Sequence, residues 1–219
     1  MRASSPIAVK ICGITQTSQA LEIASIGADA IGVIGVKSSP RFLTESKRRQ
    51  LFYELSKNAP NTKRVWVIAD LDINEIESGL NGEGTPSTIQ LHGYESKQKC
   101  AELKKLYPNI SCCKSFRVKN AKDLLLAQSY QNIVDSILLD AWSKNSLGGT
   151  GNRIPIELIK QINFQCPWWL AGGISPDCIQ DILSNLDPYG VDASSKLETI
   201  PGVKDIKKVK DLLSKVKLL

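Results

Sequence analysis

The sequence predicts a (β/α)8 (TIM) barrel formed as a single domain by residues 1–219. Short apolar runs rich in Val and Ile recur along the chain, amphipathic segments separate them, and this alternation is unbroken. Continuous apolar strands are typical of a parallel sheet covered on both faces. About eight strand-helix units match the barrel. A doubly wound open sheet is the alternative, while the pattern excludes a sandwich or a helical bundle.

The first unit begins with residues 7–12, where apolar side chains alternate with small or polar ones. This spacing predicts a strand with Cys12 at its C-terminal tip, and Gly13 ends the strand. Thr15 is a suitable N-cap for the amphipathic helix that follows, which ends at Gly27.

The other units follow the same plan. The expected strands are 28–36, 63–69, 87–92, 110–116, 136–139, 167–171 and 189–191. Helical spacing occurs at 44–57, 73–80, 96–107, 121–128 and 177–186, with further helices from Pro155 and from near Lys204. Thr44 is the expected cap of its helix, and Pro155 suits a first helical turn.

The chain has a net charge of +6 and a pI of about 9.0. Part of the excess comes from lysines of the expected last helix, Lys204, Lys207, Lys208, Lys210, Lys215 and Lys217. Aromatic residues do not interleave with this charge, so a solvated helix face is favoured over nucleic-acid binding.

Compartment and cofactor class are also constrained by composition. No apolar run is long enough to cross a membrane, and residues 1–6 do not resemble a secretory signal, so a cytoplasmic protein is expected. The six cysteines form no CxxC pair and the chain has one histidine, which argues against a zinc site. Reduced thiols are expected, with Cys112 and Cys113 on opposite faces of a strand.

Polar residues gather just after the expected strands, where a barrel of this kind carries its active site. They are Cys12, Arg41, Gln90, His92, Arg117, Asp140, Gly172, Gly173, Ser194 and Ser195. The glycines after the seventh strand and the serines after the eighth occupy the two positions that a phosphate site uses in such barrels. Each alone would indicate only a tight turn.

Cys12 and Asp140 form a candidate acid/base pair across this mouth. A thiolate can remove a proton from carbon, and a carboxyl group in a dry site can protonate a leaving oxygen. The alternatives are a buried apolar cysteine and an aspartate that caps a turn. For His92 the favoured interpretation is a packed side chain that is hydrogen-bonded to the backbone. Gln90 is expected to support the site from the core, and arginines such as Arg41 and Arg117 are more often surface charges.

Several motifs resemble one family, phosphoribosylanthranilate isomerase of tryptophan biosynthesis. They run in order along the chain: Lys10-Ile11-Cys12-Gly13-Ile14-Thr15, Ser39-Pro40-Arg41, Gln90-Leu91-His92-Gly93, Leu138-Leu139-Asp140, Gly148-Gly149-Thr150-Gly151, Leu170-Ala171-Gly172-Gly173-Ile174, Gly190-Val191-Asp192-Ala193-Ser194-Ser195 and Gly202-Val203-Lys204-Asp205. Each motif is weak alone, but the ordered set is specific.

The resemblance implies an Amadori rearrangement of N-(5-phosphoribosyl)anthranilate without a metal or organic cofactor. Asp140 would be the general acid and Cys12 the general base. The implied substrate-binding residues are Arg41, His92, Gly149, Gly172, Gly173, Asp192, Ser194 and Ser195. Among these, Arg41 would hold the anthranilate carboxylate, and the glycine and serine backbone would take the phosphate. The implied partner is this phosphosugar alone, with the chain a monomer or a homodimer.

Three departures from the family pattern stand out. Lys196 replaces a glycine after the paired serines, 154–156 replaces the usual Phe-Asp-Trp, and the third strand ends in 68–70 rather than Phe-Val-Asn. Two rival functions remain. One is the related isomerase of histidine biosynthesis, which works with paired aspartates and so disagrees with Cys12. The other is an inactive barrel kept as a binding subunit.

Overall fold

The computed structural model describes residues 6–141 and 154–217, and eight parallel strands close there into a barrel in chain order. The strands are β1 (Ala8–Cys12), β2 (Ala30–Ile34), β3 (Lys63–Ile68), β4 (Thr88–Leu91), β5 (Ser111–Val118), β6 (Ser136–Ala141), β7 (Trp168–Leu170) and β8 (Gly190–Ala193). β8 pairs with β1 and closes the ring. The predicted barrel is therefore confirmed, and the open sheet is excluded.

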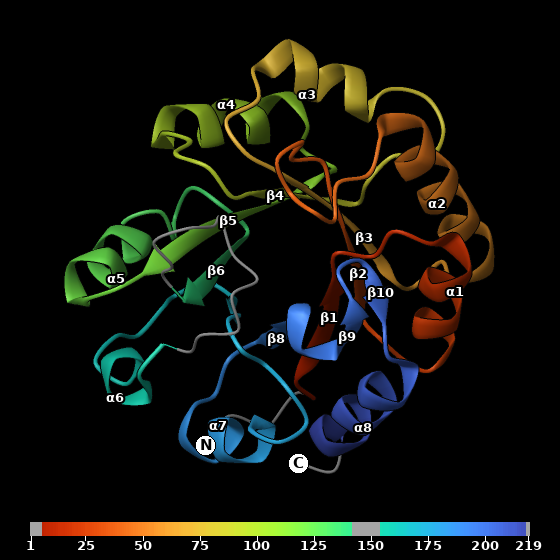
Figure 1. Cartoon of the computed structure of the whole chain (residues 1–219). Helices are drawn as coiled ribbons and strands as arrows, with labels where there is room; N and C mark the ends of the chain where they lie inside the picture. The colour runs from red at the N-terminus through yellow and green to blue at the C-terminus, as the bar shows by residue number, and fades with distance from the viewer. Residues whose placement is uncertain (1–5, 142–153, 218–219) are drawn as a thin grey trace.

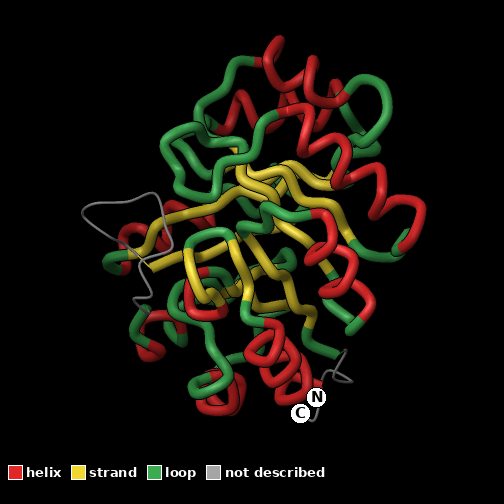
Figure 2. The backbone as a smooth tube through the Cα atoms, turned by 45° about the vertical axis from the view of Figure 1, so that its right-hand side comes forward, coloured by secondary structure: helices red, strands yellow, loops and turns green. Residues whose placement is uncertain are grey.

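Helices surround the ring of strands (Figures 1 and 2). They are α1 (Thr17–Ser25), α2 (Glu45–Asn58), α3 (Ile73–Leu80), α4 (Lys97–Leu106), α5 (Ala121–Gln128), α6 (Ile156–Ile159), α7 (Ile179–Asn185) and α8 (Ile206–Lys217). Among the described residues, no helix has the length and apolar character needed to span a bilayer.

Local chemistry explains several helix starts. Asp72 accepts a hydrogen bond from the Glu75 amide and Glu75 accepts one from the Asp72 amide, a capping box that begins α3. The predicted Thr15 cap is wrong, because α1 begins two residues later and its N-cap is Gln16. The Thr15 hydroxyl instead donates to the Gly202 carbonyl, 2.6 Å away, and so ties the β1 loop to a distant segment.

Side chains alternate between the barrel interior and the helix layer, as strand geometry requires. One continuous apolar core fills the space between strands and helices and includes Val9, Ile11 and Cys112. A smaller interior cluster contains Cys113 with Leu138, Trp169 and Ala171. The prediction that Cys112 and Cys113 face opposite ways is thus confirmed.

Three strands run two residues further than predicted. β5 continues to Val118, β6 to Ala141 and β8 to Ala193. The sequence analysis ended each strand at the polar residue that follows its apolar run. Arg117, Asp140 and Asp192 nevertheless continue the strands, because each pairs in register with a residue of the neighbouring strand.

The segment between β8 and α8 holds elements that the sequence analysis missed. A 3-10 turn, η1 (Ser195–Leu197), leads into a hairpin of β9 (Glu198–Ile200) and β10 (Val203–Lys204). Lys204 was expected on a solvated helix, and this was wrong. It lies in β10, is 2% exposed, and donates to Glu198 at 2.7 Å.

Candidate active site

A cavity of about 340 Å³ opens at the carboxyl ends of the barrel strands. The residues predicted from sequence that line it are Cys12, Arg41, Gln90, His92, Asp140, Gly172, Gly173, Asp192, Ser194 and Ser195. Gly149 lies outside the described residues. Predicted residues from six strands or their following loops therefore converge on one space, as a barrel mouth requires.

Cys12 ends β1 and is buried at the cavity wall. Its neighbours Ala30, Val65 and Val67 are small or apolar. A Cβ on Gly32 would lie 2.7 Å from the Cys12 sulfur, so the absence of a side chain there makes room for the thiol. Burial raises the pKa of the Cys12 thiol, and the Lys10 ammonium opposes that rise.

Asp140 projects into the cavity from β6. Its Oδ1 accepts a hydrogen bond from the Ala141 amide at 2.8 Å. Burial raises the pKa of this carboxyl to about 7, and the charge of Asp192 adds to the effect. A carboxyl group with this pKa holds its proton in a large fraction of molecules at neutral pH, as a general acid must.

His92 approaches Asp140 from β4's end. The His92 Nε2 lies 3.7 Å from Asp140 Oδ2, and the other ring nitrogen, Nδ1, lies 3.2 Å from the Gln90 side-chain nitrogen. If Gln90 donates to Nδ1, the ring proton sits on Nε2 and faces the carboxyl group. The supporting role predicted for Gln90 agrees with its burial and with this contact.

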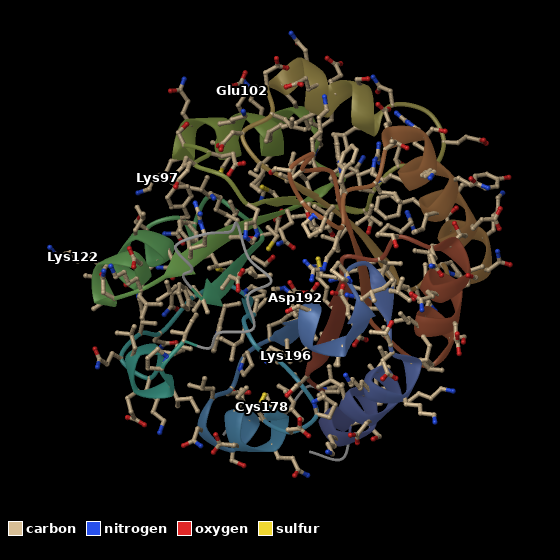
Figure 3. The ribbon with its side chains drawn as sticks, in the orientation of Figure 1. Lys97, Glu102, Lys122, Cys178, Asp192 and Lys196 are labelled. Carbon is tan, nitrogen blue, oxygen red and sulfur yellow. The ribbon has the colours of Figure 1, made fainter. Side chains whose placement is uncertain are left out.

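Lys10 and Asp192 form a buried ion pair in the barrel interior, and the sequence analysis missed Lys10. The ammonium lies 3.0 Å from each oxygen of Asp192, on the adjacent strand β8 and in direct register. Figure 3 shows Asp192 near the centre of the ring. A lysine inside an otherwise apolar alternating strand was the available signal, because a buried ammonium needs a partner.

Arg41 lines the cavity but also holds Glu198, which the sequence analysis missed. Arg41 Nε and Nη2 donate to the two Glu198 oxygens at 2.8 and 2.6 Å. The arginine stem crosses Gly13, where a Cβ would lie 2.5 Å from Arg41 Cδ and where φ is +76°. Glu198 also accepts a hydrogen bond from Lys204. The Arg41–Glu198 ion pair therefore joins the loop after β2 to the hairpin after β8.

The glycine and serine loops border the same cavity as Arg41. Gly172 and Gly173 have φ of 89° and 65°, a conformation that turns the backbone and that L side chains avoid. The Ser194 hydroxyl donates to the Cys12 carbonyl at 3.0 Å, so it fixes the β1 tip. Lys196 on η1 is exposed and lines the rim (Figure 3).

Among residues 6–141 and 154–217, no group of three or more His, Cys, Asp or Glu side chains is placed to hold a metal ion. The cavity instead offers a thiol, a carboxyl group of raised pKa, an arginine and turned backbone. Such a set can move protons and bind anions.

Comparisons with known sequences agree over the whole barrel. The model of the N-(5'phosphoribosyl)anthranilate (PRA) isomerase family matches residues 9–215. The N-(5'-phosphoribosyl)anthranilate isomerase of Nostoc punctiforme is 41% identical over 213 residues, covering 95% of this chain and 97% of that protein. That of Thermosynechococcus vestitus is 39% identical over 208 residues, covering 95% and 89%.

Solved structures give the same result. Phosphoribosyl anthranilate isomerase from Thermotoga maritima superposes with a TM-score of 0.86 at 30% identity, covering 97% of this chain and all (100%) of that one. Another phosphoribosyl anthranilate isomerase, in complex with reduced 1-(o-carboxyphenylamino)-1-deoxyribulose 5-phosphate, superposes at 0.81 with 29% identity and the same coverage.

Proposed function

The chain belongs to the N-(5'-phosphoribosyl)anthranilate isomerase family, and on that premise we propose which of its residues perform the reaction. The enzyme converts N-(5-phosphoribosyl)anthranilate into 1-(2-carboxyphenylamino)-1-deoxyribulose 5-phosphate in tryptophan biosynthesis. The observation that carries the assignment of residues is that Cys12 and Asp140, from non-adjacent strands, line one cavity.

The reaction needs one acid and one base. Asp140 donates its proton to the ribose ring oxygen, the bond from that oxygen to C1 breaks, and the anthranilate nitrogen forms a Schiff base with C1. The Cys12 thiolate then takes the proton from C2, and the electron pair moves to give an enolamine. Tautomerisation of the enolamine yields the ketose, so substrate and product are isomers and no electrons are gained or lost.

The direct test is turnover itself. Phosphoribosylanthranilate fluoresces, and the purified protein is expected to remove that fluorescence as the aromatic amine is rearranged. A protein that binds the substrate without consuming it would instead be an inactive barrel. Consumption of the histidine-pathway substrate alone would assign the rival isomerase reaction.

We propose that Arg41 binds the anthranilate carboxylate. Its Nε and Nη2 are held by Glu198, and within the described residues Nη1 has no hydrogen-bond partner. A guanidinium carries five N–H donors, so Arg41 still offers donors to the cavity while it binds Glu198. Hydrogen bonding from Arg41 and Lys204 keeps the pKa of Glu198 low despite burial, so it stays charged.

Glu198→Gln tests whether the ion pair with Glu198 positions Arg41. We expect KM to rise about tenfold with kcat changed little, because charge-assisted hydrogen bonds contribute about 1.5–3 kcal/mol and here they act through binding. Steady-state kinetics measure the split. The matched control is Glu157→Gln, which removes an exposed helix ion pair with Lys160. A tenfold fall of kcat with KM unchanged would contradict the proposed role of Glu198 in positioning Arg41 for binding.

We propose that the phosphate binds at Gly172, Gly173, Ser194 and Ser195, with Lys196 adding a charge. The turned glycine backbone and η1 border the same cavity, and Lys196 makes no ion pair within the described residues. Backbone N–H groups at such loops bind phosphate without side chains. An unpaired ammonium at the rim would strengthen that binding and increase its dependence on salt.

Lys196→Gln is expected to raise KM by about threefold to tenfold at low salt and much less at 0.5 M salt, since screening already weakens an exposed charge there. The comparison variant is Lys208→Gln, which removes an exposed lysine of α8. KM measured at two salt concentrations decides. Identical salt dependence in Lys196→Gln and the unaltered protein would rule out the phosphate contact.

We also propose that residues 1–219 form one domain and that the enzyme works in the cytoplasm as a monomer or homodimer. The closed barrel and the family match over residues 9–215 support the first point. A solved Thermotoga maritima relative is described as a dimeric enzyme from which monomers were generated. Sedimentation velocity would give the oligomeric state directly.

A further inference from the structure

Cys12 is buried, yet it must lose its proton before it can act as a base. Only the thiolate can take a proton from carbon, and the sulfur lies among apolar side chains. Burial raises the pKa of Cys12 and so disfavours the form that reacts. A nearby cation is therefore needed to offset the burial.

Lys10 is the cation best placed for this. It precedes Cys12 by two residues on β1, so both side chains point into the barrel. Its side chain is 3% exposed and its ammonium is held by both Asp192 oxygens at 3.0 Å. The pKa of Cys12 is lowered first by the Lys10 charge and its hydrogen bond, and less by Lys204.

We propose that Lys10 is a positioning residue whose ammonium, which Asp192 also binds, favours the thiolate form of Cys12. The effect on turnover rests on the proposed role of Cys12 as the base. Lys10 does not exchange the proton itself. Burial alone would lower the pKa of Lys10, but the charge of Asp192 raises it above the usual value, so the ammonium stays charged.

A purely structural ion pair is the competing explanation, and the barrel contains one for comparison. Lys114 on β5 is 2% exposed and pairs with Glu95 at 3.1 Å. It is not among the main influences on the pKa of Cys12, which are burial, Lys10, Asp192 and Lys204. Lys114→Met thus removes a buried ammonium from an ion pair without removing the cation beside the sulfur.

The test follows alkylation of Cys12 by iodoacetamide across pH, read from the mass of its peptide. The thiolate is the reacting form. We expect Lys10→Met to slow alkylation about tenfold at neutral pH, which corresponds to an upward shift of about one pH unit. Lys10→Arg should restore most of the rate, and Lys114→Met should leave the Cys12 profile unchanged.

Asp192→Asn gives a second and opposite expectation. The Asp192 charge raises the pKa of Cys12, so its removal should speed alkylation even though it breaks the same ion pair. A structural role predicts that both substitutions change the profile in one direction. An unshifted profile in folded Lys10→Met would overturn the proposal, and if that variant does not fold, unchanged or slower alkylation of Asp192→Asn would do so.

The two proposals fail separately. A Lys10-dependent alkylation profile in a protein that does not consume phosphoribosylanthranilate would keep the Lys10 assignment and remove the proposed roles in turnover. Normal turnover with an alkylation profile that does not change in Lys10→Met would keep the proposed function and remove the Lys10 assignment. Where both hold, kcat/KM of Lys10→Met should fall and its pH dependence should move to higher pH.

Discussion

Replacing Cys12 with alanine is expected to lower kcat by a factor of about 10²–10⁴, the range for loss of a positioned general base. The sulfur is the only thiol that lines the described part of the cavity, and no other group there combines a position at the β1 tip with a nearby ammonium. Loss of substrate fluorescence measures the rate. Binding should persist, because Arg41 and the loops proposed to bind the phosphate are untouched.

The alanine variant should remain folded. It removes one sulfur from a pocket bounded by the small or apolar side chains of Ala30, Val65 and Val67. Cys113→Ala is the matched control, since that thiol is also buried inside the barrel but lines a separate cavity at the other end. Activity retained in Cys12→Ala, or lost equally in Cys113→Ala, would remove the base assignment.

The barrel could be predicted from sequence because its signal is local. Each strand is a short apolar run with a glycine or polar loop after it, and each helix has its own amphipathic spacing. The hairpin of β9 and β10 lacks such a signal. Its strands are two or three residues long, and Thr15 and Arg41, which come from distant segments, hold it in place.

Part of the site could likewise be predicted from sequence and part could not. Cys12, His92, Gly172 and Gly173 could be predicted to line one cavity because residues at strand ends share one edge of a parallel barrel. Lys10 and Glu198 could not be assigned, because their roles depend on partners 182 and 157 positions away. A charged residue inside an apolar strand signals a partner but does not identify it.

Asp140→Asn is expected to reduce kcat/KM by about 10²–10⁴-fold, since the amide cannot protonate the ribose ring oxygen. The Ala141 amide can still donate to Oδ1 of asparagine, so the local backbone should not move. Asp135→Asn, just before the other end of the same strand, is the control and should leave turnover intact. Comparable activity in Asp140→Asn would refute the general-acid role.

The pH dependence of the unaltered enzyme should report the same carboxyl group. As the proposed general acid, Asp140 would act when protonated, and its pKa is raised to about 7, so its contribution to kcat/KM should fall as pH rises through 7. At higher pH the thiolate base gains population, which gives a profile limited on both sides. In Asp140→Asn the residual rate should lose the decline above pH 7.

Asp140→Asn should lower activity but raise stability above pH 7. Between about pH 4, the ordinary Asp value, and about pH 7 the folded protein keeps the Asp140 proton that the unfolded chain has released. Unfolding free energy therefore falls as pH rises through this window, and ionised Asp140 destabilises the fold above it. Asp140→Asn should accordingly melt at a higher temperature than the unaltered protein at pH 8, with the gap closing below pH 4. Thermal unfolding at the two pH values measures this, and a variant less stable at pH 8 would show that Asp140 is a structural anchor rather than a strained acid.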